Sequence, residues 1–202
     1  FTDNATLNSQ DAGSDVSEDN DLRLLAGAGN ISFNADIGNR ANGADFNGQL
    51  GDFVVENTTG TVTFGGSDTE DTPVDLAPVS FVRTNGVIDL GQGTDDTLDV
   101  IGGIFLNGGN TTADTTLQIL TSGDDIRFNG AVELQGGVTI TTNFNDTTND
   151  ADQPLFGNIL FTDNATLNSQ DAGSDVSEDN DLRLLAGAGN ISFNADIGNR
   201  AN

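Results

Sequence analysis

The sequence predicts an all-β protein, a parallel β-solenoid in which each short strand pairs with the coils above and below it. Three observations lead to this prediction: a long identical repeat, short alternating apolar pairs separated by glycine, and asparagines at the ends of those pairs. Alternation with a period of two indicates strands, and no stretch shows helical periodicity over a useful length.

The long repeat is the first observation. Residues 1–42 recur without a change as residues 161–202, so the sequence has a period of 160 residues. We therefore expect residues 1–160 to be one full repeat unit of a continuous β-solenoid in a tandem array. Residues 161–202 would then be the start of the next unit. An artificially duplicated end is the alternative.

A weaker repeat lies inside this period. Each of its copies has two apolar pairs of i, i+2 spacing that begin nine residues apart. The copies are residues 21–33, 52–64, 78–90 and 116–128, and their turn glycines are Gly29, Gly60, Gly86 and Gly123. Later pairs follow at six residues, which is too short for a relaxed hairpin and suits a chain that bends around a solenoid.

The apolar pairs also predict the interior. We expect it to be drawn from Leu24, Ile31, Phe33, Val62, Phe64, Ile88, Leu90, Ile104, Leu106, Ile126 and Phe128. The polar stretches between the pairs would leave the solenoid as loops. Five or six coils at ~4.8 Å each would make one period ~25–30 Å long.

An apolar–Asn–small pattern marks the predicted corners. It occurs at Asn34, Asn47, Asn107 and Asn129. Asn and Gly tolerate left-handed backbone angles, which tight corners need. Stacked asparagine side chains can also hydrogen-bond along the axis of such a stack, so we expect a structural role for these residues.

Composition excludes many functions. The chain has 32 acidic residues, six basic residues that are all Arg, and a net charge of −26. It has no His, Cys or Lys, which excludes a Ser-His-Asp triad, a Cys nucleophile, a usual zinc site and a Schiff base. Such a charge is repelled by nucleic acid and by anionic membranes, and no apolar run is long enough for membrane insertion.

The acidic clusters are candidate Ca²⁺ sites, because carboxylate oxygens at short spacing suit this ion. The candidate ligands are Asp95, Asp96, Asp99, Asp124 and Asp125. The alternative is a solvated acidic surface that keeps a long fibre soluble.

Arginines offer a second kind of candidate site. Arg127 beside Asp124 and Asp125 imitates the carboxylate–arginine sites of polysaccharide-acting enzymes. With 32 acids in the chain such proximity is unavoidable, and no Trp or Tyr offers a sugar platform, so we do not expect an enzyme. Salt bridges to carboxylates on adjacent coils are the simpler role for Arg23, Arg40, Arg83 and Arg127.

Three strings carry a family resemblance, LLAGAGNISFNADIG at residues 24–38, TNGVIDLGQGTDDTLDVIGGIFLNGG at residues 84–109 and SGDDIRFNGAVELQGGVTI at residues 122–140. They resemble giant repetitive bacterial surface and extracellular proteins with β-strand repeats, similar in style to the β-solenoid adhesins of the filamentous-haemagglutinin type. The resemblance implies a right-handed parallel β-helix, a location outside the cell or on its surface, and a role in adhesion, sheath or fibre formation.

Together these observations predict a structural protein that forms an elongated extracellular fibre, stalk or sheath, with further copies of itself as partners. A calcium-dependent adhesin that recognises glycans or neighbouring cells is the alternative. A polysaccharide-acting β-helix enzyme is a third hypothesis. Tandem β-sandwich domains are the alternative fold, but these need about 100 residues each and usually a Trp or Tyr in the core, and this chain has neither.

Overall fold

The computed structural model describes residues 1, 7, 20–38, 50–56, 58–65, 81–84, 87–92, 100–107, 117–142, 156–169 and 180–198. These residues form strands, bridges and turns, with no helix among them. The predicted all-β class is therefore confirmed. All strand pairs among these residues are parallel, whereas β-sandwiches pair their strands antiparallel.

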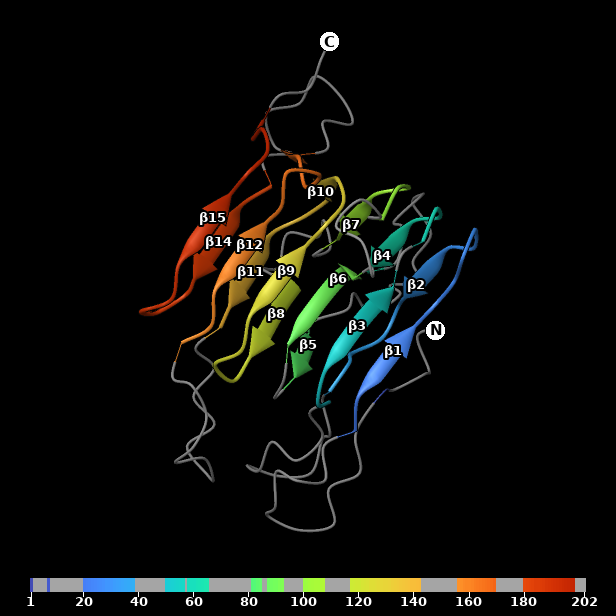
Figure 1. Cartoon of the computed structure of the whole chain (residues 1–202), viewed down its shortest axis with the longest axis horizontal. Helices are drawn as coiled ribbons and strands as arrows, with labels where there is room; N and C mark the ends of the chain where they lie inside the picture. The colour runs from blue at the N-terminus through green and yellow to red at the C-terminus, as the bar shows by residue number, and fades with distance from the viewer. Residues whose placement is uncertain are drawn as a thin grey trace, which may run out of the picture.

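In the described ranges, fifteen strands lie in three stacked sheets (Figure 1). The six-stranded sheet contains, in spatial order, β1 (Leu22–Leu24), β3 (Phe53–Glu56), β6 (Ile88–Gln92), β9 (Ile126–Phe128), β12 (Ile159–Phe161) and β15 (Ile191–Phe193). The five-stranded sheet contains β2 (Ile31–Phe33), β4 (Val62–Phe64), β7 (Ile104–Leu106), β10 (Val132–Leu134) and β13 (Leu167–Ser169). The four-stranded sheet contains β5 (Phe81–Thr84), β8 (Leu117–Thr121), β11 (Val138–Thr141) and β14 (Leu182–Leu185).

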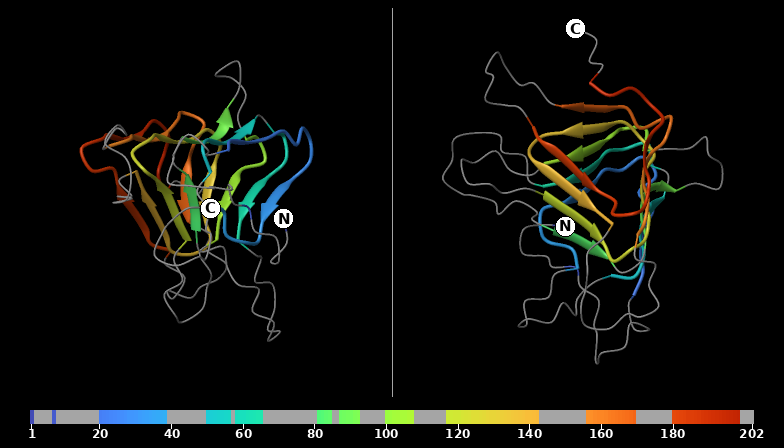
Figure 2. Two further views of the ribbon diagram at one scale, coloured as in Figure 1. Left: turned by 90° about the horizontal axis from the view of Figure 1, so that it is seen from below. Right: turned by 90° about the vertical axis from the view of Figure 1, so that its left-hand side faces the viewer.

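The chain visits the six-, five- and four-stranded sheets in turn, and we call one such passage a circuit. In the first circuit Ile37 and Leu50 hold the third position, where they bridge to Val82 and Thr84 of β5. Strand neighbours therefore come from successive circuits, and the left view of Figure 2 shows the colour running from blue at one end of the stack to red at the other. This arrangement is compatible with a parallel β-helix.

Alternating side chains of these strands form the core. The residues expected in the interior are buried at Ile31, Phe33, Val62, Phe64, Ile88, Leu90, Ile104, Leu106, Ile126 and Phe128. Leu24 differs: it is only half-buried, because β1 is the first strand of its sheet and has a strand neighbour on one side alone. Each fully buried side chain of this kind contributes ~1.5–3 kcal/mol of hydrophobic stabilisation.

Phenylalanine rings stack along the axis within this core. Phe33 lies between Phe1 and Phe64, with ring centroids 5.0 and 5.1 Å away. A second column joins Phe128, Phe161 and Phe193, with 4.8 Å between successive centroids. This spacing matches the ~4.8 Å between paired strands, so each ring packs on the ring of the next circuit.

The turn glycines are needed because the backbones of successive circuits approach closely. A Cβ atom on Gly60 would overlap the carbonyl oxygen of Gly29, and one on Gly102 would overlap that of Gly60. These three glycines form one column at the corner between the six- and five-stranded sheets.

The repeated sequence occupies different sheets in its two copies. β1 lies in the six-stranded sheet, whereas its copy β14 lies in the four-stranded sheet. β2 lies in the five-stranded sheet, whereas its copy β15 lies in the six-stranded sheet. The second copy of the segment is thus displaced by one sheet relative to the first.

The period is therefore not a whole number of circuits. From β1 the chain completes four circuits through β3, β6, β9 and β12, and then crosses two more sheets to reach β14. One period is four and two thirds circuits, or ~22 Å at ~4.8 Å each. This is fewer than the expected five or six coils, because Ile37 and Leu50 both bridge to β5 and so share one position of a circuit.

Candidate functional site

Asp124 and Asp125, two of the candidate calcium ligands, lie directly before β9. The Asp125 carboxylate accepts hydrogen bonds from the backbone N–H and the side-chain Nδ2 of Asn158, at 2.6 and 3.0 Å. The carbonyl oxygen of Asp124 accepts one from the Thr121 hydroxyl at 2.5 Å. In the described part of the chain, no three Asp, Glu, His or Cys residues gather in a way that could hold a metal ion. Asp95, Asp96 and Asp99 lie outside the described residues.

Asp125 belongs instead to a ladder of side chains at the entrance to the strands. Each Oδ1 atom accepts the backbone N–H of the equivalent residue one circuit later. Asn158 accepts from Asn190 at 2.9 Å, Asp21 from Asp52 at 2.8 Å, and Asp52 from Val87 at 3.0 Å. These bonds fix the register between circuits in addition to the strand ladder itself.

Sequence reasoning missed this ladder. Its signal is an Asp or Asn directly before an apolar pair, as in Asp52-Phe53 and Asn158-Ile159. In a chain so rich in acidic residues, the same Asp also fits a solvated loop.

Among the predicted corner asparagines, Asn129 has the most described contacts. Its Nδ2 donates to the Gly91 carbonyl at 3.1 Å, and its Oδ1 accepts from the Thr162 hydroxyl at 2.6 Å. It therefore connects the circuits before and after its own. Asn34 and Asn107 also directly follow strands, and their backbone N–H groups donate to the carbonyls of Phe1 and Phe64.

Asn47 lies outside the described residues. Asparagine side chains do hydrogen-bond to one another between circuits: Nδ2 of Asn164 lies 3.3 Å from Oδ1 of the corner residue Asn129. Nδ2 of Asn190 likewise lies 3.3 Å from Oδ1 of Asn158.

Among the described residues, two ion pairs lie on the outer face of the six-stranded sheet, and each joins an arginine to a carboxylate on an adjacent circuit, as expected. Arg127 contacts Asp89 at 3.1 Å rather than Asp124 or Asp125, and Arg23 pairs with Glu56. Removal of the Asp89 carboxyl from water raises its pKa above the ordinary 3.8, although the Arg127 charge opposes this shift. Arg127 thus stabilises strand neighbours and is not part of a carboxylate–arginine site beside β9.

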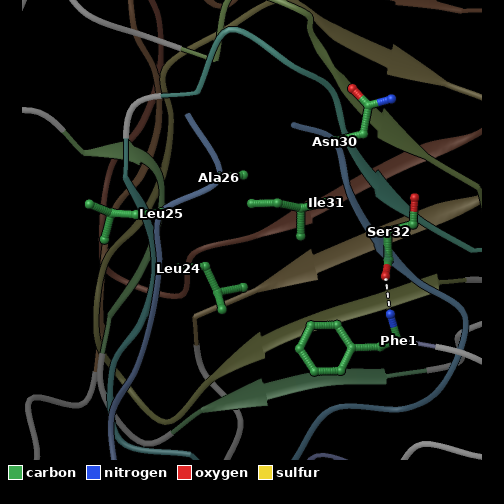
Figure 3. A pocket seen from close by; sticks show the side chains of 7 residues that line it. All are labelled: Phe1, Leu24, Leu25, Ala26, Asn30, Ile31 and Ser32. Atoms are coloured by element: carbon green, nitrogen blue, oxygen red, sulfur yellow. Dashed lines mark hydrogen bonds between the residues drawn. The ribbon is translucent and has the colours of Figure 1, made fainter. Parts of the chain in front are cut away.

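An open hollow lies at the first circuit of the stack (Figure 3). It is lined by Phe1, Leu24, Leu25, Ala26, Asn30, Ile31 and Ser32. The Phe1 ammonium group donates to the Ser32 carbonyl at 2.9 Å. At the copy of this region, strand β12 of the preceding circuit pairs with β15, which contains Ile191.

Another open surface lies at the last circuit, on β14, β15 and Ile197. Ile191, Phe193 and Ile197 are all exposed there.

In comparisons with known proteins, no family model matches the chain, and no curated protein or solved structure matches it. Within the described ranges, no helix is long and apolar enough to cross a membrane.

Proposed function

We propose that the chain is part of a structural protein, an elongated extracellular rod built as a right-handed parallel β-helix from tandem 160-residue units. The right hand follows the general preference of crossovers between parallel strands. The extracellular location and the fibre role follow the resemblance of strings such as residues 24–38 to giant repetitive surface proteins.

The observation that carries the proposal is that both copies of the repeated sequence belong to the same stack of strands. Its two copies, 160 residues apart, make the same strands and join one continuous series of circuits, with β14 paired to β11 and β15 paired to β12. A unit that folded by itself would close its own core before the next copy began. Here the second copy extends the core of the first, which is how repeat rods grow.

The surface chemistry supports a rod that stays separate from its neighbours. The net charge of −26 falls on a chain whose core is apolar, so like-charged rods repel one another in solution. The stabilising contacts run along the axis: the phenylalanine columns, the Asp and Asn ladder and the parallel strand pairs. Resistance to extension along this axis is the mechanical property that a stalk or fibre needs.

Electron microscopy and small-angle X-ray scattering of chains with one, two and three periods test this proposal. We expect rods of constant cross-section that lengthen by ~22 Å for each period. A string of globular beads, or a length that grows by a domain diameter per period, would contradict it. A chain of three periods with Phe33, Phe64 and Phe161 changed to Asp in each unit is the control and should not form rods.

A further inference from the structure

The corner after β9 contains an Asn-Gly pair, which is a candidate site of chemical modification. Asparagine directly before glycine loses its side-chain amide more readily than asparagine before other residues, because glycine has no side chain to hinder attack by its backbone nitrogen. Asn-Gly pairs of this chain begin at Asn42, Asn47, Asn85, Asn107 and Asn129. Among them, Asn129–Gly130 is the pair of which both residues lie in the described ranges.

The reaction at such a pair has two steps. The backbone nitrogen of Gly130 attacks Cγ of Asn129, so that a new N–C bond forms and the bond between Cγ and Nδ2 breaks. Ammonia leaves with the proton of the Gly130 N–H group, and a succinimide ring remains. Water then opens this ring at one of its two carbonyls, which gives aspartate or isoaspartate at position 129.

The fold holds the Asn129 amide between two other circuits. Nδ2 donates to the Gly91 carbonyl at 3.1 Å in the circuit before. Oδ1 accepts from the Thr162 hydroxyl at 2.6 Å and from Nδ2 of Asn164 at 3.3 Å, both in the circuit after. Asn129 is only 1% exposed. Ring formation removes Nδ2 and turns Oδ1 away from its donors, so these hydrogen bonds have to break and water has to reach the corner.

The backbone around the pair leaves little room for added atoms. A Cβ on Gly130 would lie 2.7 Å from the carbonyl oxygen of Val100, and one on Gly91 would lie 2.5 Å from the carbonyl oxygen of Asn129. Isoaspartate inserts a methylene group into the main chain at this point. Aspartate places a buried carboxylate oxygen against the Gly91 carbonyl, where the amide had donated a hydrogen bond, and such a contact is unfavourable.

We infer that Asn129–Gly130 is a latent modification site, which deamidates when the corner after β9 opens and whose product prevents that corner from closing again. The site thus converts a transient opening between circuits into a permanent defect. This inference depends on the contacts of the corner and not on the proposed role as a fibre.

Mass spectrometry of deamidation at Asn129 tests the first half of the inference. A synthetic peptide of residues 126–134 has no neighbouring circuits and gives the rate without the fold. At mildly alkaline pH, where the Gly130 N–H loses its proton more readily, we expect the folded 202-residue chain to react at least ~100-fold more slowly than the peptide. Urea should raise the rate in the chain to that in the peptide. Equal rates in the folded chain and the peptide would overturn the inference.

A pair of threonine variants tests whether the opening is local. Thr162→Val keeps the shape of the side chain but removes the hydroxyl that donates to Asn129, and should speed deamidation in the folded chain about tenfold. Thr142→Val is the matched control, because the buried Thr142 hydroxyl donates instead to the Gly157 carbonyl at 2.8 Å. This control should leave the rate at Asn129 unchanged. Equal rates in the two variants would contradict a local opening at this corner.

Asn129→Asp, which has the sequence of the aspartate product, tests the second half. The backbone N–H groups of Val100 and Thr162 donate to the carbonyls of Asn129 and Phe128 at the corner. We expect their hydrogen exchange to be at least about tenfold faster in the variant. The N–H of Phe53, which bonds between other circuits, is the internal reference and should be unchanged. Unchanged exchange at Val100 and Thr162, or equal acceleration at Phe53, would overturn the proposed local defect.

Discussion

Residues 21–38 and residues 181–198 share one sequence but differ in surroundings. The first segment starts in the six-stranded sheet and is covered by the next circuit, whereas the second starts in the four-stranded sheet and is covered by the circuit before it. The same phenylalanine is fully buried at position 33 and partly exposed at position 193. In this stack a side chain becomes core through its neighbouring circuits, and the same substitution should have different effects in the two copies.

The largest difference is expected for phenylalanine. Phe33→Ala removes a buried ring that contacts Phe1, Phe53 and Phe64, and should lower the free energy of unfolding by ~3–5 kcal/mol. Phe193→Ala removes a partly exposed ring stacked on Phe161 and should cost ~1 kcal/mol. Urea unfolding of the two variants measures both losses, and equal losses would contradict the difference between the copies.

For the turn glycine, the larger loss of stability is expected in the second copy. A Cβ on Gly189 would overlap the carbonyl oxygen of Gly157, whereas one on Gly29 would lie 3.2 Å from the Ala26 carbonyl oxygen. Gly189→Ala should therefore cost ~1–3 kcal/mol through overpacking, and Gly29→Ala less than half of that. Loss of protection at the Ile159 amide, which donates to the Asn190 carbonyl, reports the first change locally. The comparison fails if Gly29→Ala is the more damaging variant.

Asp89 allows a test at an interior position of the stack, because its strand β6 pairs with a strand on each side. Since burial raises the pKa of Asp89 above 3.8, the folded chain holds this proton more tightly than the unfolded chain. Its contribution to stability is therefore present at low pH and is lost as the pH rises from 3.8 through the raised pKa.

Asp89→Asn removes this titration. The free energy of unfolding of the variant, minus that of the unchanged chain, should rise with pH across that window and be flat below it. Parallel urea titrations at several pH values measure the difference. A difference that falls with pH would mean that attraction to Arg127, and not burial, dominates.

The smallest effect is expected for the removal of calcium. The described Asp125 carboxylate is engaged by Asn158, so chelation with EDTA should shift Tm by less than ~2 °C, or under ~1 kcal/mol. A larger calcium-dependent rise in Tm would favour the calcium-dependent adhesin instead.

Much of the strand pattern could be predicted from the sequence. Pairs such as Ile31/Phe33 and Ile126/Phe128 have apolar residues at i and i+2, and both became strands with buried ends and an outward middle residue. Period-two alternation reports burial on one face of any strand, so it was sufficient to locate these elements.

The sheet to which each strand belongs could not be predicted. The aligned segments 21–33 and 116–128 look alike, yet the first runs from the six- to the five-stranded sheet and the second from the four- to the six-stranded sheet. An apolar pair has the same pattern on every sheet, so the sequence does not distinguish one corner from another.

The offset of four and two thirds circuits has a consequence for symmetry. In an array of identical units, each unit is shifted by one sheet from the unit before it, so the array has in effect a threefold screw axis. The pattern on one side then returns only after three units, 480 residues and fourteen circuits, which is ~67 Å along the axis. Every segment of the unit is thereby presented on every side of the rod, and the acidic charge is spread around the axis although the unit itself has no symmetry.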